Sequence, residues 1–238
     1  MIKFTAPLVL SLSVLSGAAN ADALGLFVGG GLWDYDSSGT FGSDGGANST
    51  IDVESDLNFT GDSEAYVWAA FEHFVPLVPN IRIEASSVSD AGNGAGFTFK
   101  GVTVAGDAAI SLDTVDTILY YRLLDNWVNF DFGLNIRKLT GDFTLATEVV
   151  SISETVPMLY VAAQFDLPFS GLSFGGDINT ISFSGSKYQD VRVRVLYEIG
   201  VIGFELGYKT TTIKLDDVGN INSNLEFKGV MLGAFLHF

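Results

Sequence analysis

The sequence contains no cysteine, only five prolines and two histidines, and far fewer basic than acidic residues. Without cysteine the chain has no disulfide framework, no thiolate metal site and no cysteine nucleophile. Its 12 Lys and Arg residues against 28 Asp and Glu give a formal net charge of −16. This charge would repel nucleic acid phosphates, so we predict no nucleic acid partner. Charged residues make up 17% of the chain and hydrophobic residues 47%, a balance that excludes an intrinsically disordered protein.

A hydrophobic run long enough for a transmembrane helix is also missing. At the N-terminus, Lys3 precedes a short apolar stretch over 6–15, and Ala19-Asn20-Ala21 fits a signal-peptidase site. The apolar stretch is shorter than the ~20 residues that a membrane-spanning helix needs. We therefore predict that residues 1–21 are a signal peptide and that residues 22–238 form the exported protein.

The exported chain shows instead an alternation of apolar and polar residues with the period of a β-strand. Residues 127–138, 190–199 and 202–208 each place aliphatic or aromatic side chains on one face, and charged residues or glycine on the other. The longest of these segments reach the ~10 residues that a tilted strand needs to cross a bilayer. In lipid, only a closed barrel gives the backbone N–H and C=O groups of every strand a hydrogen-bond partner. The pattern therefore predicts an all-β protein, a transmembrane antiparallel up-and-down β-barrel.

Turn signals divide the chain into about ten strands. Eight is the alternative, because the third and fourth segments alternate most weakly. The predicted strands are 24–35, 64–75, 81–88, 109–123, 127–138, 157–167, 172–183, 190–199, 202–208 and 225–238. Segments 36–63, 89–107 and 140–155 are rich in Gly, Ser, Thr or Asp, and we predict that they form long extracellular loops. Connections alternate between the two ends of the barrel, so the turns 76–80, 125–126 and 168–171 and the turn at Gly200 are then periplasmic.

Charged residues on the polar faces are expected to meet inside the barrel. All five arginines fall on these faces, and Arg pairs bidentately with carboxylates. Such pairs either fill and stiffen a narrow lumen or line a constriction that selects small solutes. The predicted lumen charge network consists of Glu72, Arg82, Glu84, Asp116, Arg122, Asp131, Arg137, Asp177, Arg192, Arg194, Glu198, Glu205 and Lys209.

Two other functions are considered beside a structural barrel or limited small-solute passage. The acidic first loop suits surface recognition or adhesion. A lipid-modifying or proteolytic barrel enzyme is less favoured, because His73 and His237 are both predicted at the periplasmic ends of strands. The sequence also has no His-Glu-x-x-His motif. We predict no catalytic residues, no cofactor and no metal site.

The C-terminus carries a feature of its own. An alternating strand ends at Phe238, with Leu236 on the same face. A terminal aromatic residue on such a strand resembles the signal that the bacterial barrel-assembly machinery reads. We therefore expect this machinery to be a partner during biogenesis.

Segment 72–82, EHFVPLVPNIR, resembles the EHP-x-P-x-x-PN-x-R turn of an uncharacterised family of Gram-negative outer-membrane β-barrel proteins, with Phe74 where the family has proline. Segments 118–126, 157–160, 165–168 and 207–209 and the terminal Gly-x-x-x-His-Phe are also similar. The resemblance spans the exported chain. It implies a barrel in the bacterial outer membrane, and it implies no activity. We expect a monomer in contact with outer-membrane lipid and lipopolysaccharide.

Overall fold

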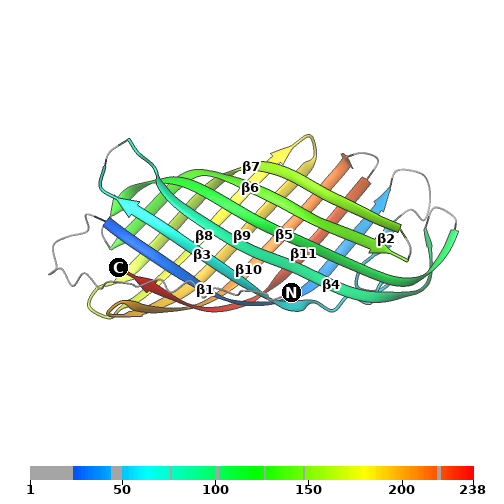
Figure 1. Ribbon diagram of the computed structural model, residues 1–238, viewed down its shortest axis with the longest axis horizontal. Coiled ribbons are helices and arrows are strands. Elements are labelled where there is room, and N and C mark those ends of the chain that lie inside the picture. The colour runs from blue at the N-terminus through cyan, green and yellow to red at the C-terminus, as the bar shows by residue number, and fades with distance from the viewer. Residues whose placement is uncertain are drawn as a thin grey trace, which may run out of the picture.

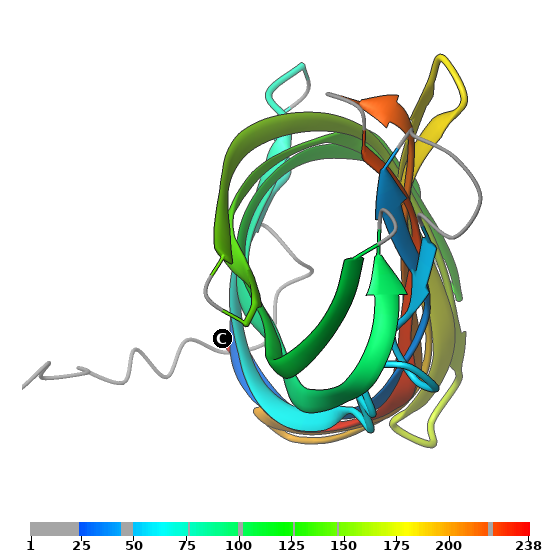
Figure 2. The ribbon, with the colours of Figure 1, turned by 90° about the vertical axis from the view of Figure 1, so that its right-hand side faces the viewer.

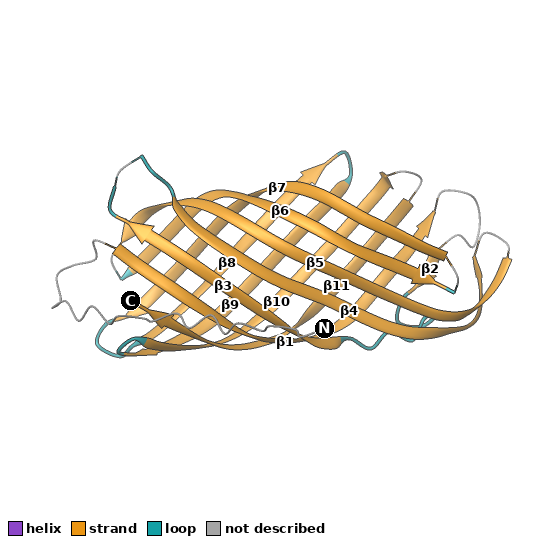
Figure 3. Ribbon diagram, in the orientation of Figure 1, coloured by secondary structure: helices purple, strands orange, loops and turns teal. Residues whose placement is uncertain are grey.

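The computed structural model describes residues 24–43, 50–75, 77–99, 102–125, 127–146, 148–218 and 221–238. The predicted signal peptide, residues 1–21, lies outside the described residues. Every regular element among the described residues is a β-strand (Figure 3). Within these residues, no helix is long and apolar enough to cross a membrane. The strands are β1 (Leu24–Ser43), β2 (Thr50–Asp52), β3 (Asp62–His73), β4 (Asn80–Phe99), β5 (Val102–Asp125), β6 (Val128–Leu145), β7 (Glu148–Leu167), β8 (Leu172–Phe183), β9 (Ser186–Ile199), β10 (Ile202–Val218) and β11 (Ile221–His237).

These strands form one closed antiparallel barrel. From β3 to β11 each strand pairs with the next, β1 pairs with β3, and β11 pairs with β1 to close the sheet. The short strand β2 pairs only with the end of β1, so the wall itself consists of ten strands. Figure 1 shows them tilted along the barrel, and Figure 2 shows the wall as a ring in the view along the barrel. The predicted ten-stranded barrel is confirmed, and the eight-stranded alternative is wrong.

The two ends of the barrel are built differently. The proximal end, on the left in Figure 1, holds Leu24, Phe238 and the turns that follow β3, β5, β7 and β9. Leu26 and Phe238 exchange two backbone hydrogen bonds there, at 2.9 and 3.0 Å. The distal end, on the right, holds the hairpin connections that follow β4, β6, β8 and β10.

The polarity of the two barrel faces is inverted partway along the strands, as β5 shows most clearly. In its proximal part Val115, Leu119 and Leu123 point outward and are 42–60% exposed, while Asp116 points inward and is buried. In its distal part the outward residues are polar and the inward ones apolar: Asp107, Ser111 and Asp113 outward, and Ala108, Ile110 and Leu112 inward. The proximal half thus resembles a barrel surrounded by lipid, and the distal half a barrel surrounded by water.

The prediction of long loops at 89–107 and 140–155 is wrong, because both segments are mostly paired strand. Asp90 pairs with Ile110 across the β4–β5 ladder, and Asp142 pairs with Ser151 across the β6–β7 ladder. β5 is 24 residues long, roughly twice the ~9–11 residues that cross a bilayer. The strands therefore continue well beyond the apolar belt, with their Ser, Thr and Asp residues mainly on the outer face.

The predicted loop 36–63 is also largely structured in its described residues, 36–43 and 50–63. β1 continues to Ser43, and segment 50–61 lies between the distal parts of β1 and β4, beyond the end of β3. Its contacts to β4 include hydrogen bonds from the Asn58 side-chain amide to the Asn93 carbonyl, 2.7 Å, and from the Gly61 amide to Asp90, 2.8 Å. Inward side chains of the segment, 0–2% exposed, are Ile51, Val53, Leu57 and Phe59.

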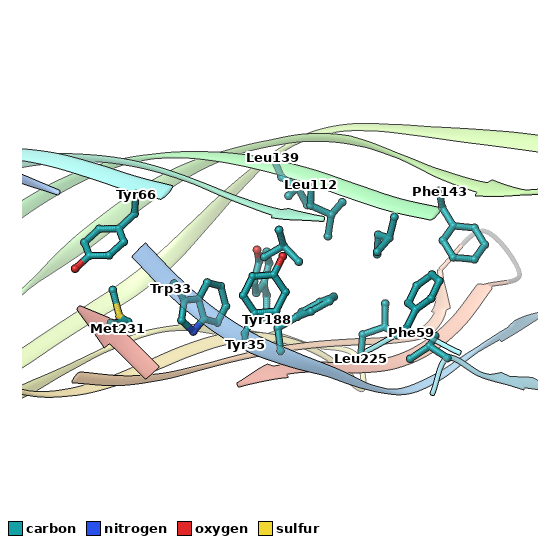
Figure 4. Close-up of a cluster of buried hydrophobic side chains, with 14 of the residues drawn as sticks. Trp33, Tyr35, Phe59, Tyr66, Leu112, Leu139, Phe143, Tyr188, Leu225 and Met231 are labelled. Atoms are coloured by element: carbon teal, nitrogen blue, oxygen red, sulfur yellow. The ribbon is translucent and has the colours of Figure 1, made fainter. Parts of the chain in front are cut away.

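These side chains belong to an apolar core that fills the distal half of the barrel. Figure 4 shows the cluster along the interior, from Tyr66 and Met231 at one side of the view to Phe59 and Phe143 at the other. Phe41 and Phe143 stack with ring centroids 4.7 Å apart, and the ring of Phe227 meets that of Tyr35 edge to face. A packed core of this kind stabilises the part of the barrel that lies outside the belt.

We expect Phe227→Ala to lower the free energy of unfolding by roughly 3–5 kcal/mol, because it leaves a cavity in this core. Phe227 is 2% exposed, whereas Phe183 in the β8–β9 hairpin is 80% exposed. Phe183→Ala is therefore the matched control, with an expected change within about 0.5 kcal/mol. Urea unfolding followed by tryptophan fluorescence measures both variants. Equal losses in the two variants would contradict a packed distal core.

Candidate functional site

The structure places the arginines and most of the carboxylates of the predicted network inside the barrel. The buried members are Arg82, Glu84, Asp116, Asp131, Arg137, Asp177, Arg192, Glu205 and Lys209. Glu72, Arg122, Arg194 and Glu198 are partly exposed and lie nearer the proximal end. The strand period explains this gathering, because residues two apart on one strand face the same side of the wall.

One cluster of the network joins β4, β8 and β9. Arg82 pairs with Glu84 at 2.8 Å, and Arg192 reaches the same carboxylate at 3.2 Å. Arg192 also donates from Nε to Asp177 at 3.0 Å. The guanidinium of Arg82 lies 4.1 Å from the ring centroid of Trp68. Glu84 is therefore held between two arginines, and Arg192 connects opposite sides of the lumen.

A second cluster is centred on Arg137. Its Nε and one terminal nitrogen each donate to Asp116 at 2.7 Å, and that terminal nitrogen also reaches Asp190 at 2.5 Å. The Asn135 side-chain amide donates to Asp116 at 2.8 Å. Asp190, which is 5% exposed, was not among the predicted network residues. Its position two residues before Arg192 on the same strand face was the signal that could have identified it.

The proximal part of the network is more open. Arg122 pairs with Glu72 at 2.6 Å and with Asp131 at 3.0 Å, and the Tyr120 hydroxyl donates to Glu72 at 2.6 Å. Arg194 is held less closely, because both of its carboxylate contacts, to Asp177 and to Glu205, are 3.7 Å long.

Aromatic and histidine side chains complete the interior. The Tyr66 hydroxyl donates to Glu205, and the ammonium of Lys209 lies 4.4 Å from the ring centroid of Trp33. Glu198 meets His237 at 3.0 Å. The sequence pattern alone did not identify the roles of Tyr66, Tyr120 and Trp68, because these inward aromatic residues lie among apolar neighbours.

Three of the ion pairs join residues that are direct cross-strand neighbours. These register pairs are Asp116 with Arg137, Arg122 with Asp131, and Asp177 with Arg192. Opposite charges at directly opposed positions stabilise a strand pair. Because the buried charges are paired and hydrogen-bonded, the free energy lost on removing them from water is offset.

The network and the aromatic residues next to it leave little free space at mid-barrel. Arg137 is 2%, Arg192 5% and Glu205 3% exposed. Two small cavities among these side chains measure about 10 Å³ each, room for at most about one water molecule apiece. A larger cavity of about 150 Å³ lies among the proximal members of the network, lined by residues that include Arg122, Tyr120 and Phe235.

The two histidines lie at the proximal end. The His73 ring accepts a hydrogen bond from the Val75 amide at 3.3 Å, next to the turn that follows β3. The His237 ring stacks on Phe27 with ring centroids 4.0 Å apart. Among the described residues, no three His, Asp or Glu side chains are arranged to hold a metal ion.

Comparison with models of known families and with curated proteins gives no match to this sequence. Solved structures do match. The outer membrane protease OmpT from Escherichia coli aligns with 91% of this chain and 97% of its own, at 11% identity and a TM-score of 0.53. The translocator domain of the autotransporter NalP from Neisseria meningitidis aligns with 92% of this chain and 90% of its own, at 11% identity and a TM-score of 0.44. At this identity the likeness to OmpT shows the fold of an outer-membrane β-barrel and nothing finer.

We expect Arg192→Ala to lower the free energy of unfolding by about 3–5 kcal/mol, because it removes hydrogen-bonded pairs to two buried carboxylates. Arg194→Ala, two residues away on the same strand face, is the matched comparison. Its loss is expected to be clearly smaller, since neither of its 3.7 Å contacts is a hydrogen bond. Denaturant unfolding of the refolded variants measures both, and equal effects would show that the pairing geometry does not set stability.

Proposed function

We propose that this protein is an outer-membrane β-barrel with a closed lumen that serves envelope structure and carries its distal half outside the membrane. The observation that carries this proposal is the near-complete burial of Arg137, Arg192 and Glu205 at mid-barrel, with cavities of only about 10 Å³ among the side chains around them. A hydrated ion needs a continuous water-filled path, and such packing leaves none at this level. The alternative is limited small-solute passage, and the bilayer recording described below distinguishes it from a closed lumen.

Residence in the outer membrane is supported by the belt of exposed apolar side chains on the proximal half. Examples on neighbouring strands are Val193 of β9, 56% exposed, Leu206 of β10, 55%, and Leu232 of β11, 64%. Apolar surface on this scale is stable against lipid hydrocarbon and unfavourable in water. The outer-membrane fold of OmpT agrees with this reading.

In the orientation that we propose, the proximal end faces the periplasm and the distal end the exterior. The distal outer face then presents acidic residues such as Asp36, Asp113 and Asp142 to the outside. This ordered, acidic extension supports surface recognition as a second function. Its partner would bind a surface of paired strands, in contrast to the long extracellular loops that the sequence predicted.

We propose no enzymatic role. A histidine that acts as general acid or base on an external substrate would have to lie at the distal rim. The chain's two histidines, His73 and His237, both lie at the opposite, proximal end.

Planar-bilayer recording of the refolded residues 22–238 tests the proposal. We expect no stepwise current, because ion pairs and the distal core occupy the lumen. Flotation with vesicles and strand content by circular dichroism confirm that the inserted protein is folded. Reproducible openings whose ion selectivity changes in Arg137→Ala would overturn the closed lumen and favour solute passage.

A further inference from the structure

The β6–β7 hairpin leaves one strand edge open at the distal end of the barrel. β7 pairs with β6 from Glu148 to Phe165, but it pairs with β8 only from Leu159 to Leu167. Figure 1 shows the β6–β7 hairpin reaching further toward the distal end than the β8–β9 hairpin. Residues 148–158 therefore have a partner strand on one side only, and among the described residues no other strand pairs with their second edge.

One hydrogen bond shows which backbone groups point to this open edge. The Asp166 amide of β7 donates to the Trp127 carbonyl, on the β6 side, at 2.8 Å. Along an antiparallel strand the N–H and C=O groups of successive residues point to alternate sides, and the β6–β7 register has no shift. Even-numbered residues of β7 therefore face β6. The N–H and C=O groups of the odd-numbered residues from Val149 to Thr155 point to the open edge.

The β8–β9 hairpin is held away from this edge. The Asp216 amide of β10 donates to the Ser186 hydroxyl at 3.1 Å, on the side of the hairpin opposite to β7. The Asp216 carboxylate also lies against Gly185, so that a Cβ there would overlap it. Pro157, an odd-numbered residue at the place where β7 and β8 part, has no N–H to donate to β8. The separation of the two strands is thus fixed by contacts and residues on both of them.

The open edge has little of the protection that exposed strand edges usually carry. Proteins blunt such edges with lysine, proline or bulges, because an open edge accepts another strand. Segment 148–156 contains no lysine and no proline, and five of its nine residues are β-branched. Its outward side chains Ser151, Ser153 and Thr155 are exposed. The segment therefore has the properties of a template for strand addition.

The inward side chains of the segment define which strand it accepts. Ile152 and Val156 pack against the distal core, whereas Glu154 between them is exposed, and no described residue pairs with its carboxylate. In an added antiparallel strand, the residue opposite Glu154 belongs to a non-hydrogen-bonded pair, in which side chains lie closest. A basic residue at that position pairs with the carboxylate. Apolar residues two positions before and after it extend the core.

A second copy of this chain does not fit the edge. Copies in one membrane share one orientation, so a pair of them is related by rotation about the membrane normal. Because barrel strands are tilted by roughly 35–45°, two facing β7 edges would cross at about 70–90°. Neither parallel nor antiparallel pairing forms at such an angle. The occupant is therefore a segment of another molecule.

We propose that the open edge of β7 binds an extended peptide segment of another protein by strand addition. The segment carries a basic residue opposite Glu154 and apolar residues two positions to each side of it. The proposal deepens the surface recognition proposed above as a second function, and it rests on the distal end facing the exterior. It does not depend on whether the lumen conducts.

Fluorescence anisotropy with the fluorescein-labelled peptide TSITKTVST tests the site, with residues 22–238 refolded into lipid nanodiscs. In the antiparallel register its lysine lies opposite Glu154, and its isoleucine and valine lie opposite Val156 and Ile152. We expect saturable binding of one peptide per chain. The same peptide N-methylated at the residues on either side of isoleucine and valine, whose N–H groups face β7, keeps every side chain and is expected not to bind.

Variants of the edge separate backbone pairing from side-chain contact. Ser153→Pro removes one edge donor without touching the hydrogen bonds to β6, and we expect it to weaken peptide binding about tenfold or more. Ser153→Ala is the matched control, because it loses the same hydroxyl but keeps the N–H, and it should bind as the parent does. Glu154→Lys is expected to prefer a peptide with glutamate in place of the lysine. Circular dichroism checks that each variant is folded.

No saturable binding by the folded parent would overturn the proposal, as would equal binding by Ser153→Pro or by the N-methylated peptide. A Glu154→Lys variant that still prefers the lysine peptide would contradict the basic residue. A parent dimer in detergent, measured by light scattering and dissociated by Ser153→Pro, would assign the edge to a second copy and overturn the proposal too. A silent bilayer recording together with absent peptide binding would leave the closed barrel standing and remove only this site.

Discussion

The constraint on which the structure depends is that each strand has two faces and that the medium outside the wall changes partway along it. In the proximal half the outer face is apolar, so the charged residues must point inward. In the distal half the outer face is polar, and the apolar residues must point inward to be buried. β5 carries the whole change within one strand, from Asp116 inside and Val115 outside to Leu112 inside and Asp113 outside.

The tight packing of the lumen at mid-barrel follows from this constraint. Charges forced into a narrow interior are stable only when paired, and the barrel register sets Asp116 beside Arg137 and Asp177 beside Arg192. The pairs extend across the lumen through Arg192 to Glu84, which ties distant strands together. On the distal side of these pairs, the apolar core around Phe227 fills the interior of the barrel.

The proximal half could be predicted from the sequence, and the distal half could not. Along 127–138 and 190–199 the apolar residues stay on one face and the polar residues on the other. The strands, their two faces and the inward position of the arginines could therefore be predicted from the sequence. In 89–107 the residues are mostly small or polar, among them Ser89, Asp90 and Gly92, so composition suggested a loop although the ladder to β5 continues. Which carboxylate pairs with which arginine depends on the register of the strands and on how the barrel closes. For this reason Asp190 and the tyrosines Tyr66 and Tyr120 emerged only from the structure.

The most direct test of the account is maleimide labelling of single cysteines along the outer face of β5, in a protein that has no cysteine of its own. Cysteines at Ser111, Asp113, Val115 and Leu119 all point outward, and Val115 and Leu119 are 44% and 42% exposed to whatever surrounds the barrel. With the protein in lipid vesicles, a water-soluble maleimide should label positions 111 and 113 and leave 115 and 119 unlabelled. Equal labelling at all four positions would show that no lipid boundary lies at the polarity inversion, and would contradict the account.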